Sequence, residues 1–334
     1  MSALRILVLG GTRFVGRHIV DALVAAGDSV TLFNRGMSDP SPRAGVENVR
    51  GDRSGDLSVL GGKRFDAVID TSGYTPDVVK HATRFFTSRT DRYLFVSSVS
   101  VYDLERIHSD RVDEDAPLLQ LPQGVDPTVR ADEHYGALKN LCEMEVRETF
   151  GKRAVILRPG LVAGPHDPTD RFTYWVLRIA AGGKVLAPPA DRNIQYVDVR
   201  DAARFTSTII RATAGGTYNV VAPPDGYTFG DLLYECARAS GSHPNICWTE
   251  EEFFIEQGVS PWSELPLWIP RRDSAVALLR ASPEQAVARG LQCTPLGETV
   301  RDTFTWASGA RTLDALQAGL SRSREKELLE NAGH

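Results

Sequence analysis

Near its start the chain has an apolar segment that runs directly into a glycine-rich turn. Residues 4–9 are almost all apolar, which is typical of a strand buried on both faces of a parallel sheet. The sequence GGTRFVG follows at residues 10–16, and apolar side chains then recur every three or four positions as far as Ala26. This spacing predicts a helix over residues 14–26. A buried strand, a glycine turn and a helix in this order begin folds in which strands and helices alternate.

The alternation continues through the first half of the chain. The pattern predicts strands at residues 29–33, 66–70, 93–97 and 154–157, and helices at residues 77–86 and 131–150. Strands that alternate with helices form parallel sheets with helices on both faces. We therefore predict an α/β fold of the Rossmann type, a doubly wound parallel sheet, with a smaller C-terminal lobe of short helices and loops.

The predicted domains are interleaved along the chain. The segment 194–199 has the pattern of a strand, and we expect it to return to the main sheet. On this view the Rossmann domain consists of residues 1–165 and 191–222, the C-terminal lobe of residues 166–190 and 223–320, and a tail of residues 321–334. We expect the lobe to bind the substrate.

The composition narrows the possible functions. The 334 residues include 38 basic and 43 acidic side chains, and the net charge of -5 is opposite to that of a dedicated nucleic-acid binder. The four cysteines have no CxxC pairing and no metal-ligand spacing with the seven histidines, so neither a disulfide framework nor a metal site is predicted. No apolar run approaches the ~20 residues of a membrane span. We therefore expect a cytoplasmic protein with no nucleic-acid and no membrane partner.

The glycine turn has the composition of a dinucleotide-binding site. Glycines let the backbone turn tightly and approach a pyrophosphate, whose charge then lies against the free N–H groups at the helix start. Arg13 stands where the usual spacing has a middle glycine, and its guanidinium can reach a phosphate instead. The predicted cofactor-binding residues of this turn are Gly10, Gly11, Thr12, Arg13, Phe14, Val15 and Gly16.

The residues that follow the second strand bear on the choice of cofactor. Turns that bind NAD carry Asp or Glu there, which bind the ribose hydroxyls. This chain has Asn34 and Arg35, which do not repel a 2′-phosphate and can bind one, so NADP is favoured over NAD. Asp52, after the third apolar segment, is a candidate acceptor for the adenine amino group and equally a candidate for a surface turn.

Tyr135 and Lys139 lie four residues apart on a predicted helix, which places both side chains on one face. An ordinary tyrosine, with a pKa near ~10, exchanges protons poorly at neutral pH. A neighbouring lysine charge favours the tyrosinate and is expected to bring the pKa of Tyr135 toward the working range. Ser98 follows the predicted strand 93–97 at its carboxyl end, where open α/β sheets bind ligands.

These motifs resemble those of the extended short-chain dehydrogenases/reductases, the NAD-dependent epimerase/dehydratase superfamily. The matching elements, in the family order, are GGTRFVG at 10–16, VSSVSVY at 96–102, YGALK at 135–139 and RPGLVAGP at 158–165. The GGTRF start is similar to that of an atypical subgroup. The resemblance implies that Ser98 hydrogen-bonds the substrate oxygen, Tyr135 is the acid/base and Lys139 binds the nicotinamide ribose. It also implies a homodimer.

Departures from the family pattern restrict the substrate. Dehydratases of this superfamily carry Asp-Glu directly after the catalytic Thr, and Val99 and Ser100 take those places here, which argues against dehydration. Nucleotide-sugar enzymes of the family carry an Asn where this chain has Gly160, and Arg192 is out of register with their later Arg. Recognition of a sugar-nucleotide diphosphate is therefore not predicted.

Polar groups after the strands, and in the loop that leaves RPGLVAGP, are the candidates for a substrate pocket. They are Tyr74, Ser100, Tyr102, His166, Asp167 and Arg171. His166 is a candidate second proton donor, although a lone histidine in a loop is more often structural.

The leading hypothesis is an NAD(P)-dependent oxidoreductase that moves a hydride between the nicotinamide and a carbonyl or carbinol carbon of a small metabolite. An epimerase with a retained cofactor would use the same residues, so this alternative stays open. RNA binding, which occurs in chloroplast proteins that resemble this subgroup, is disfavoured by the acidic charge. A protein that binds the cofactor without turnover is also open, but it would have no use for Ser98, Tyr135 and Lys139 together.

Overall fold

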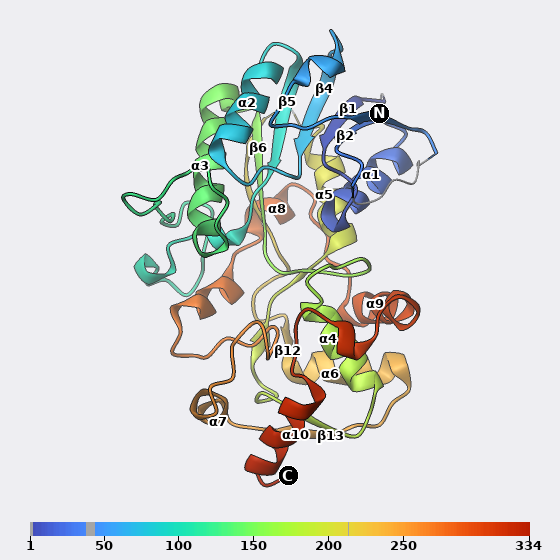
Figure 1. Cartoon of the computed structure of the whole chain (residues 1–334), viewed down its shortest axis with the longest axis vertical. Helices are drawn as coiled ribbons and strands as arrows, with labels where there is room; N and C mark the ends of the chain where they lie inside the picture. The colour runs from blue at the N-terminus through green and yellow to red at the C-terminus, as the bar shows by residue number, and fades with distance from the viewer. Residues whose placement is uncertain (1–2, 38–43, 213) are drawn as a thin grey trace. The chain divides into compact units, whose positions relative to one another are not determined.

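The central sheet of the computed structural model, which describes residues 3–37, 44–212 and 214–334, has seven strands in the order β11-β6-β5-β4-β1-β2-β3 (Figure 1). The strands are β1 (Arg5–Leu9), β2 (Ser29–Asn34), β3 (Val46–Arg50), β4 (Phe65–Asp70), β5 (Thr90–Val96), β6 (Ala154–Pro159) and β11 (Gly216–Val220). Every neighbouring pair is parallel, which confirms the predicted α/β, doubly wound fold. The strand order reverses between β1 and β4, the kind of point at which such sheets bind ligands.

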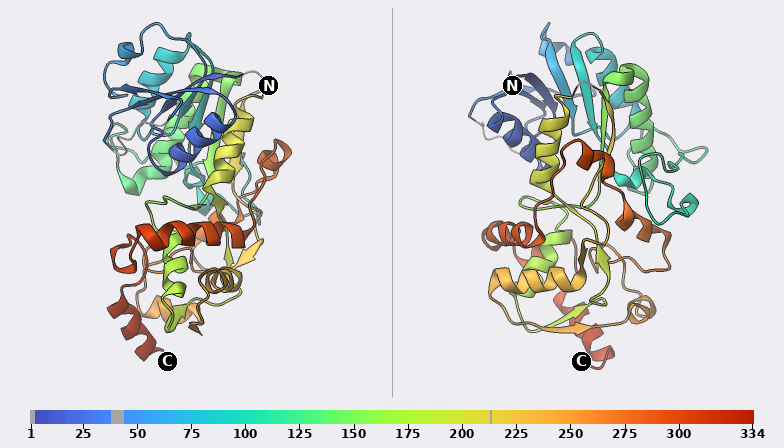
Figure 2. Two further views of the ribbon diagram at one scale, coloured as in Figure 1. Left: turned by 90° about the vertical axis from the view of Figure 1, so that its right-hand side faces the viewer. Right: turned by 180° about the vertical axis from the view of Figure 1, so that it is seen from behind.

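Helices cover both faces of this sheet. Helices α1 (Phe14–Ala25) and α5 (Val199–Ile209) pack against each other on one face, and α2 (Pro76–Phe86) and α3 (Tyr135–Phe150) pack against each other on the other face (Figure 2). The short helix α8 (Glu284–Ala288) lies beside β11. Because both faces are covered, the four apolar residues from Ile6 to Leu9 in β1 are completely buried.

The chain forms two units that are interleaved in the sequence. The first consists of Met1–Gly160, Val199–Val221 and Ala281–Gln292, and the second of Leu161–Asp198, Ala222–Arg280 and Cys293–His334. The seven-stranded sheet lies entirely in the first unit. Residues 281–292 complete that unit although most of the second unit precedes them in the chain.

The segment 194–199 does not enter the main sheet, so this prediction is wrong. Its residues contribute to β9 (Asn193–Ile194) and β10 (Val197–Asp198), which pair with β12 (Tyr227–Thr228) and β7 (Val162–Ala163) in the second unit. The strand that joins the edge of the main sheet next to β6 is β11. The sequence pattern marks an extended segment but does not specify its partner, because every strand presents the same backbone donors and acceptors.

The second unit is built mainly from helices. Its elements include α4 (Arg171–Ala180), α6 (Phe229–Ser240), α9 (Leu296–Ala310), the shorter α7 (Glu251–Glu256), and a parallel pair of strands, β8 (Lys184–Ala187) and β13 (Asn245–Trp248). Helices α4, α6 and α9 pack on one another. Helix α6 begins with a capping box, in which Thr228 and Asp231 each bind the other's backbone N–H.

The predicted tail contains a further helix, α10 (Arg322–Asn331). Glu325 on this helix accepts hydrogen bonds from the Arg178 guanidinium of α4 at 3.0 and 2.8 Å, and both side chains are buried. Ser321 caps the helix by accepting from the Arg324 N–H. The buried pair therefore ties the C-terminal helix to α4.

The part of the chain that the structure describes holds no candidate metal centre, because no group of three His, Cys, Asp or Glu side chains comes together in it. Nor does any helix in that part have the length and apolarity needed to cross a bilayer. Cys142, Cys236 and Cys247 are free thiols, and all three are buried.

Candidate functional site

The glycine turn joins β1 to α1 and requires glycine at three positions. Gly10 and Gly11 have φ of 100° and 81°, values that favour glycine. A Cβ atom on Gly10 would lie 2.6 Å from the Thr71 Oγ1, and one on Gly16 would lie 2.9 Å from the Gly11 Cα. The turn is therefore packed tightly against the segment that follows β4 and against the first turn of α1.

The start of α1 fits a phosphate group. Its N-cap residue, Arg13, makes no side-chain cap hydrogen bond, and the first turn contains no acidic residue. Phe14, the first residue of the helix, has φ of 23°, a strained value for a residue other than glycine. Because the N–H groups and the dipole at a helix start attract anions, this turn is suited to a pyrophosphate.

Two arginines flank the ends of β2 and β3. Asn34, the last residue of β2, accepts a hydrogen bond from the Gly36 N–H at 2.8 Å, so its side chain closes the turn that follows. Arg35 is exposed. Arg50 lies opposite Asn34 in the sheet register, and its Nε is 3.0 Å from where a Cβ on Gly36 would be. Two guanidinium groups, those of Arg35 and Arg50, therefore lie at the ends of β2 and β3. The sequence reasoning missed Arg50.

Asp52 closes a turn of its own. Its Oδ1 accepts hydrogen bonds from the N–H and the hydroxyl of Ser54, at 2.9 and 2.6 Å. These two bonds, and to a smaller extent the charge of Arg35, lower the pKa of the Asp52 carboxyl. Of the two roles considered for Asp52, the structure shows the turn; adenine binding stays a prediction.

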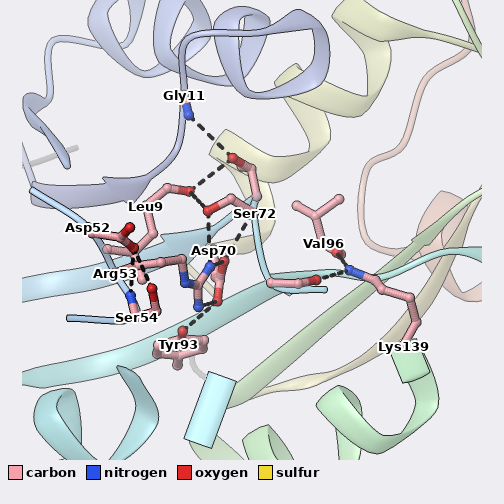
Figure 3. A network of polar contacts seen from close by, with 12 residues as sticks. Leu9, Gly11, Asp52, Arg53, Ser54, Asp70, Ser72, Tyr93, Val96 and Lys139 are labelled. Atoms are coloured by element: carbon pink, nitrogen blue, oxygen red, sulfur yellow. Dashed lines mark hydrogen bonds and ion pairs between the residues drawn. The ribbon is translucent and has the colours of Figure 1, made fainter. Parts of the chain in front are cut away.

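Arg53 and Asp70 form a buried ion pair at the same edge of the sheet (Figure 3). The Arg53 guanidinium donates to both carboxylate oxygens, with Nη2 2.6 Å from Oδ2. Asp70, at the end of β4, also accepts from the Tyr93 hydroxyl at 2.8 Å. Burial acts to raise the pKa of Asp70, but the charge and hydrogen bonds of Arg53 outweigh it and leave that pKa below its ordinary value. Neither residue belongs to a motif, and the sequence reasoning missed both.

A chain of hydrogen bonds connects this ion pair to the glycine turn, as Figure 3 shows. Arg53 donates to the Ser72 hydroxyl at 3.0 Å, and Ser72 donates to the Leu9 carbonyl at 3.2 Å. The Thr71 hydroxyl donates to the same carbonyl at 3.0 Å and accepts from the Gly11 N–H at 3.3 Å. The position of the turn therefore depends on the residues that follow β4.

Lys139 lies one turn into α3 and is anchored to the backbone after two strands. Its Nζ donates to the carbonyls of Gly73 at 2.9 Å and Val96 at 2.7 Å (Figure 3). The same atom is 4.0 Å from the centroid of the Phe95 ring. The side chain is 3% exposed, and burial lowers the pKa of its ammonium to about 8. Lys139 therefore ties α3 to the ends of β4 and β5.

Tyr135 is the first residue of α3, and its proton is held more tightly than predicted. Burial, and then the neighbouring Tyr74, raise the pKa of Tyr135 to about 12, while a hydrogen bond with Ser98 and the charge of Arg130 act against this rise. The expected lowering by Lys139 is therefore wrong, because that ammonium is directed to backbone carbonyls. The phenol keeps its proton at neutral pH.

Ser98 and Ser100 lie beside the start of α3. The Ser98 Oγ accepts from the Ser100 N–H at 3.1 Å and donates to the Ser100 hydroxyl at 3.0 Å, in the turn that follows β5. Gly136 packs so closely here that a Cβ on it would lie 1.9 Å from the Ser100 carbonyl oxygen. The structure thus brings Ser98, Ser100 and Tyr135 together.

Tyr74 and Arg130 lie close to Tyr135. The Arg130 guanidinium carbon is 4.2 Å from the centroid of the Tyr74 ring, and the Lys139 ammonium is 5.7 Å from it. Both side chains reach solvent, since Tyr74 is 37% exposed and the Arg130 side chain 58% exposed. Tyr74 is a predicted substrate residue, whereas Arg130 belongs to no motif. Only its position in the sequence, five residues before Tyr135, could have indicated Arg130.

Tyr102 does not line a pocket, which corrects the prediction that it contacts substrate. It is 1% exposed, its hydroxyl donates to the Asn219 Oδ1 at 2.6 Å, and it accepts from the Arg158 guanidinium at 3.0 Å. Arg158 pairs in turn with Glu143 of α3 at 2.7 Å, and both of these side chains are completely buried. Tyr102 therefore belongs to a network that joins β6, β11 and α3.

His166 and Arg171 lie in the second unit, before and at the start of α4. His166 has φ of 71°, and its ring centroid is 5.3 Å from that of Trp306. The Arg171 Nε donates to the Trp262 carbonyl at 3.3 Å. Within this unit both residues thus contact tryptophans, and their roles toward a substrate stay predictions.

Asp167 is completely buried in the same loop. Its Oδ1 accepts from the N–H and the hydroxyl of Thr169, both at 2.8 Å, and its Oδ2 has no hydrogen-bond partner among the described residues. Burial raises the pKa of this carboxyl to about 6. Asp167 is therefore a carboxylic acid that takes up a proton close to neutral pH.

The first unit, with its glycine turn and its Ser98, Tyr135 and Lys139 at one edge of a parallel sheet, has the form of a dinucleotide-binding enzyme of the short-chain dehydrogenase/reductase class. Residues 74–221 match the model of the NAD dependent epimerase/dehydratase family. The match covers less than half of the chain and supports the resemblance seen in its motifs.

Other similar proteins differ in what their names describe. The chloroplast stem-loop binding protein of 41 kDa b of Arabidopsis thaliana is 28% identical over 260 residues, which cover 72% of this chain and 64% of that protein. The UDP-glucose 4-epimerase of Thermus thermophilus, solved with NAD, is 20% identical, with a TM-score of 0.62 over 92% of this chain and 99% of that one. The Bordetella bronchiseptica enzyme WbmH, solved with NAD+, is 17% identical, with a TM-score of 0.67 over 92% and 100%. At these identities the solved structures show the fold that the chain shares with them.

Proposed function

We propose that the chain is an NAD(P)-dependent oxidoreductase that transfers a hydride between the nicotinamide and a carbonyl or carbinol carbon of a small metabolite. One observation carries the proposal. Ser98, Tyr135 and Lys139 gather at the carboxyl edge of the sheet, in the same unit as a glycine turn whose shape and helix start suit a pyrophosphate. The match of residues 74–221 to the NAD dependent epimerase/dehydratase family supports the nicotinamide cofactor.

Each residue of the site has a separate role when the substrate carbonyl is reduced. A nicotinamide bound at the glycine turn would supply the hydride. Tyr135 donates its proton to the carbonyl oxygen of the substrate, and a pKa of about 12 keeps this proton available at neutral pH. Ser98, which is hydrogen-bonded to Tyr135, donates its proton to the same oxygen, in place of the Ser100 hydroxyl, as negative charge develops on that oxygen. Lys139 holds the start of α3 in register with the ends of β4 and β5.

Tyr135→Phe tests the proposed acid. Turnover is expected to fall by about 10²–10⁴-fold, because a positioned proton donor contributes about that much. Cofactor affinity, measured by calorimetry, should survive. The matched control is Tyr234→Phe, on the exposed side of α6, where the side chain is 66% exposed. Turnover by Tyr135→Phe at the rate of this control would overturn the assignment.

We also propose that NADP is preferred over NAD. Arg35 and Arg50 support this preference, because both are exposed at the ends of β2 and β3 and the side chain that ends β2 is an uncharged Asn34. NADPH is expected to bind at least about tenfold more tightly than NADH, and Arg35→Gln should reduce the difference. Equal affinities, or a preference for NADH, would contradict the proposal.

The epimerase alternative is supported by the names of the similar solved structures, which include UDP-glucose 4-epimerase. An epimerase would retain its cofactor and return the hydride to the carbon that lost it. The cofactor released on denaturing protein purified without added nucleotide separates the two functions. Retained NAD in equal amount to the chain would favour the epimerase, and protein free of cofactor would favour the oxidoreductase.

A second candidate function, RNA binding, is favoured by the name of the Arabidopsis relative. The net charge of -5 opposes it, because binding to phosphates depends on cationic side chains that release counterions. A gel-shift assay with a stem-loop RNA at about 0.15 M salt should show no complex. A complex that withstands this salt would make the RNA function the better candidate.

The proposal places the protein in the cytoplasm as a homodimer that acts on a small molecule, without nucleic-acid or membrane partners. The free thiols of Cys142, Cys236 and Cys247 support a reducing compartment. Light scattering during gel filtration measures the oligomeric state. A monomer at micromolar concentration would contradict this part of the proposal.

A further inference from the structure

The side chains next to Tyr135 include a cation that the proposed chemistry does not use. Arg130 precedes α3, and its guanidinium carbon lies 4.2 Å from the centroid of the Tyr74 ring. The contact with the ring holds the guanidinium in place without using its N–H donors in conventional hydrogen bonds. Arg130 is therefore positioned by an aromatic side chain and still able to bind a ligand.

The ion pair that Arg130 makes is weak. Its Nε lies 3.6 Å from the Asp132 Oδ1, and the two side chains are 58% and 90% exposed. An exposed pair of this kind contributes about 0–1 kcal/mol, so a ligand anion can replace the carboxylate at little cost. Tyr74, which lies under the guanidinium, is itself more than a third exposed.

The Arg130 guanidinium lies close enough to the Tyr135 phenol for its positive charge to act against the rise of the pKa of that phenol. A guanidinium matches the two oxygens of a carboxylate or of a phosphate. This side of the site therefore suits an anionic substrate better than a neutral one.

We propose that Arg130 and Tyr74 form a subsite for an anionic group, a carboxylate or a phosphate, that the substrate carries close to the carbonyl reduced at Tyr135. The inference rests on the proposed function, because it places the subsite beside the proposed acid. Arg130 binds the anion with its N–H donors, and the Tyr74 ring holds the guanidinium close to Tyr135. The anion thereby selects among carbonyl compounds.

The test compares matched aldehydes with NADPH as reductant. The carboxylate pair is 4-oxobutanoate and butanal, and the phosphate pair is glyceraldehyde 3-phosphate and glyceraldehyde. The wild-type kcat/KM should favour the anionic member of at least one pair by about tenfold or more, and that pair identifies the anion. Arg130→Gln should reduce the preference to about threefold or less, mainly through KM, and Arg130→Lys should keep part of it.

A matched control exists in the same unit. Arg89 places its guanidinium carbon 4.0 Å from the centroid of the Phe85 ring, so Arg89→Gln removes the same kind of contact elsewhere and should keep the wild-type preference. Equal kcat/KM for both members of each pair in the wild type, or an equal loss for both members in Arg130→Gln, would overturn the subsite. Weaker NADPH binding by Arg130→Gln, with the preference unchanged, would assign Arg130 to the cofactor and also overturn it.

Failure of the proposed function is distinguishable from failure of the subsite. If the wild-type protein binds NADPH but reduces none of the four aldehydes, the oxidoreductase proposal loses its support. The subsite is then decided by calorimetry with succinate and with inorganic phosphate on the NADPH-bound protein. Binding of one of them that weakens about tenfold in Arg130→Gln and not in Arg89→Gln supports the subsite. Absence of binding, or equal affinity in both variants, overturns it.

Discussion

Arg53 and Lys139, two buried cations at the same edge of the sheet, have pKa values that are shifted in opposite directions. Burial acts to lower the pKa of both, because the charged form loses its hydration. Arg53 faces the carboxylate of Asp70, and its pKa ends above the ordinary value; Lys139 faces two backbone carbonyls, and its pKa falls to about 8. The partner therefore decides the outcome: a carboxylate outweighs the loss of hydration and neutral dipoles do not.

This difference separates the two halves of the candidate site. On the cofactor side, the Arg53–Asp70 pair supports the glycine turn through Ser72 and Thr71, and each charge depends on the other. On the catalytic side, Lys139 can lose its proton without leaving a buried carboxylate alone. The cofactor side is therefore supported by an ion pair that keeps its charges. The catalytic side is supported by a lysine that can titrate.

The largest expected effect is on the cofactor side. Arg53→Ala leaves Asp70 buried without its cation, and we expect the free energy of unfolding to fall by about 3–5 kcal/mol in urea titrations. The control is Lys63→Ala, which breaks a pair with Glu47 whose side chains are 48% and 50% exposed. It should lose no more than about 1 kcal/mol. A loss for Arg53→Ala as small as that of the control would mean that burial does not distinguish these pairs.

The next effect tests the catalytic side through its pH dependence. The pKa of Lys139 is about 8 in the folded protein against an ordinary 10.5, so between these values the unfolded chain binds more protons and stability rises with pH. Lys139→Met removes this titration. The stability of the wild type relative to the variant should therefore grow across that interval, by about 2–3 kcal/mol in urea titrations at fixed pH. A flat or falling difference would contradict the comparison with Arg53.

The sequence predicts the residues that belong to motifs better than the residues that support them. The alternation of apolar strands and amphipathic helices is local, so the pattern predicts β1, β2, β4, β5 and β6 and the helices α1, α2 and α3 correctly. It omits β3 and β11 and wrongly adds the segment 194–199 to the sheet. Arg53 and Asp70 are 17 positions apart, and only the pairing of β1 with β4 and the path of the loop after β3 bring them together. No spacing rule in the sequence expresses that contact.

The wrong predictions for the pKa of Tyr135 and for the role of Tyr102 also come from contacts between distant parts of the chain. Four-residue spacing correctly places Lys139 on the face of α3 that carries Tyr135, but it does not show that the carbonyls of Gly73 and Val96 lie within reach of the ammonium. Tyr102 follows a strand at a plausible pocket position, yet Asn219, 117 positions away, takes its hydroxyl into the core. Both outcomes depend on long-range packing, which a single sequence does not display.

The substitution Gly136→Ala is expected to displace the start of α3, on the catalytic side, and to leave the cofactor side in place. A Cβ at this position would lie 1.9 Å from the Ser100 carbonyl oxygen, so the start of α3 must shift and carry Tyr135 with it. Such overpacking costs about 1–3 kcal/mol of stability, and a displacement of ~1 Å lowers kcat by about 10²-fold. Gly62→Ala is the control, because nothing lies within 4 Å of its added Cβ. If NADPH affinity falls as far as kcat, the two halves of the site are not separate.

The smallest expected effect decides the role of Asp52. Asp52→Ala removes two hydrogen bonds to Ser54, which should cost about 0.5–1 kcal/mol of stability, and the NADPH dissociation constant should stay within about twofold of the wild type. Ser54→Ala removes the hydroxyl bond and leaves the carboxylate in place. If Asp52→Ala weakens NADPH binding by about tenfold and Ser54→Ala does not, the carboxylate binds the adenine amino group. The cofactor side would then hold its ligand with Asp52 directly as well as through the support that Arg53 and Asp70 give the turn.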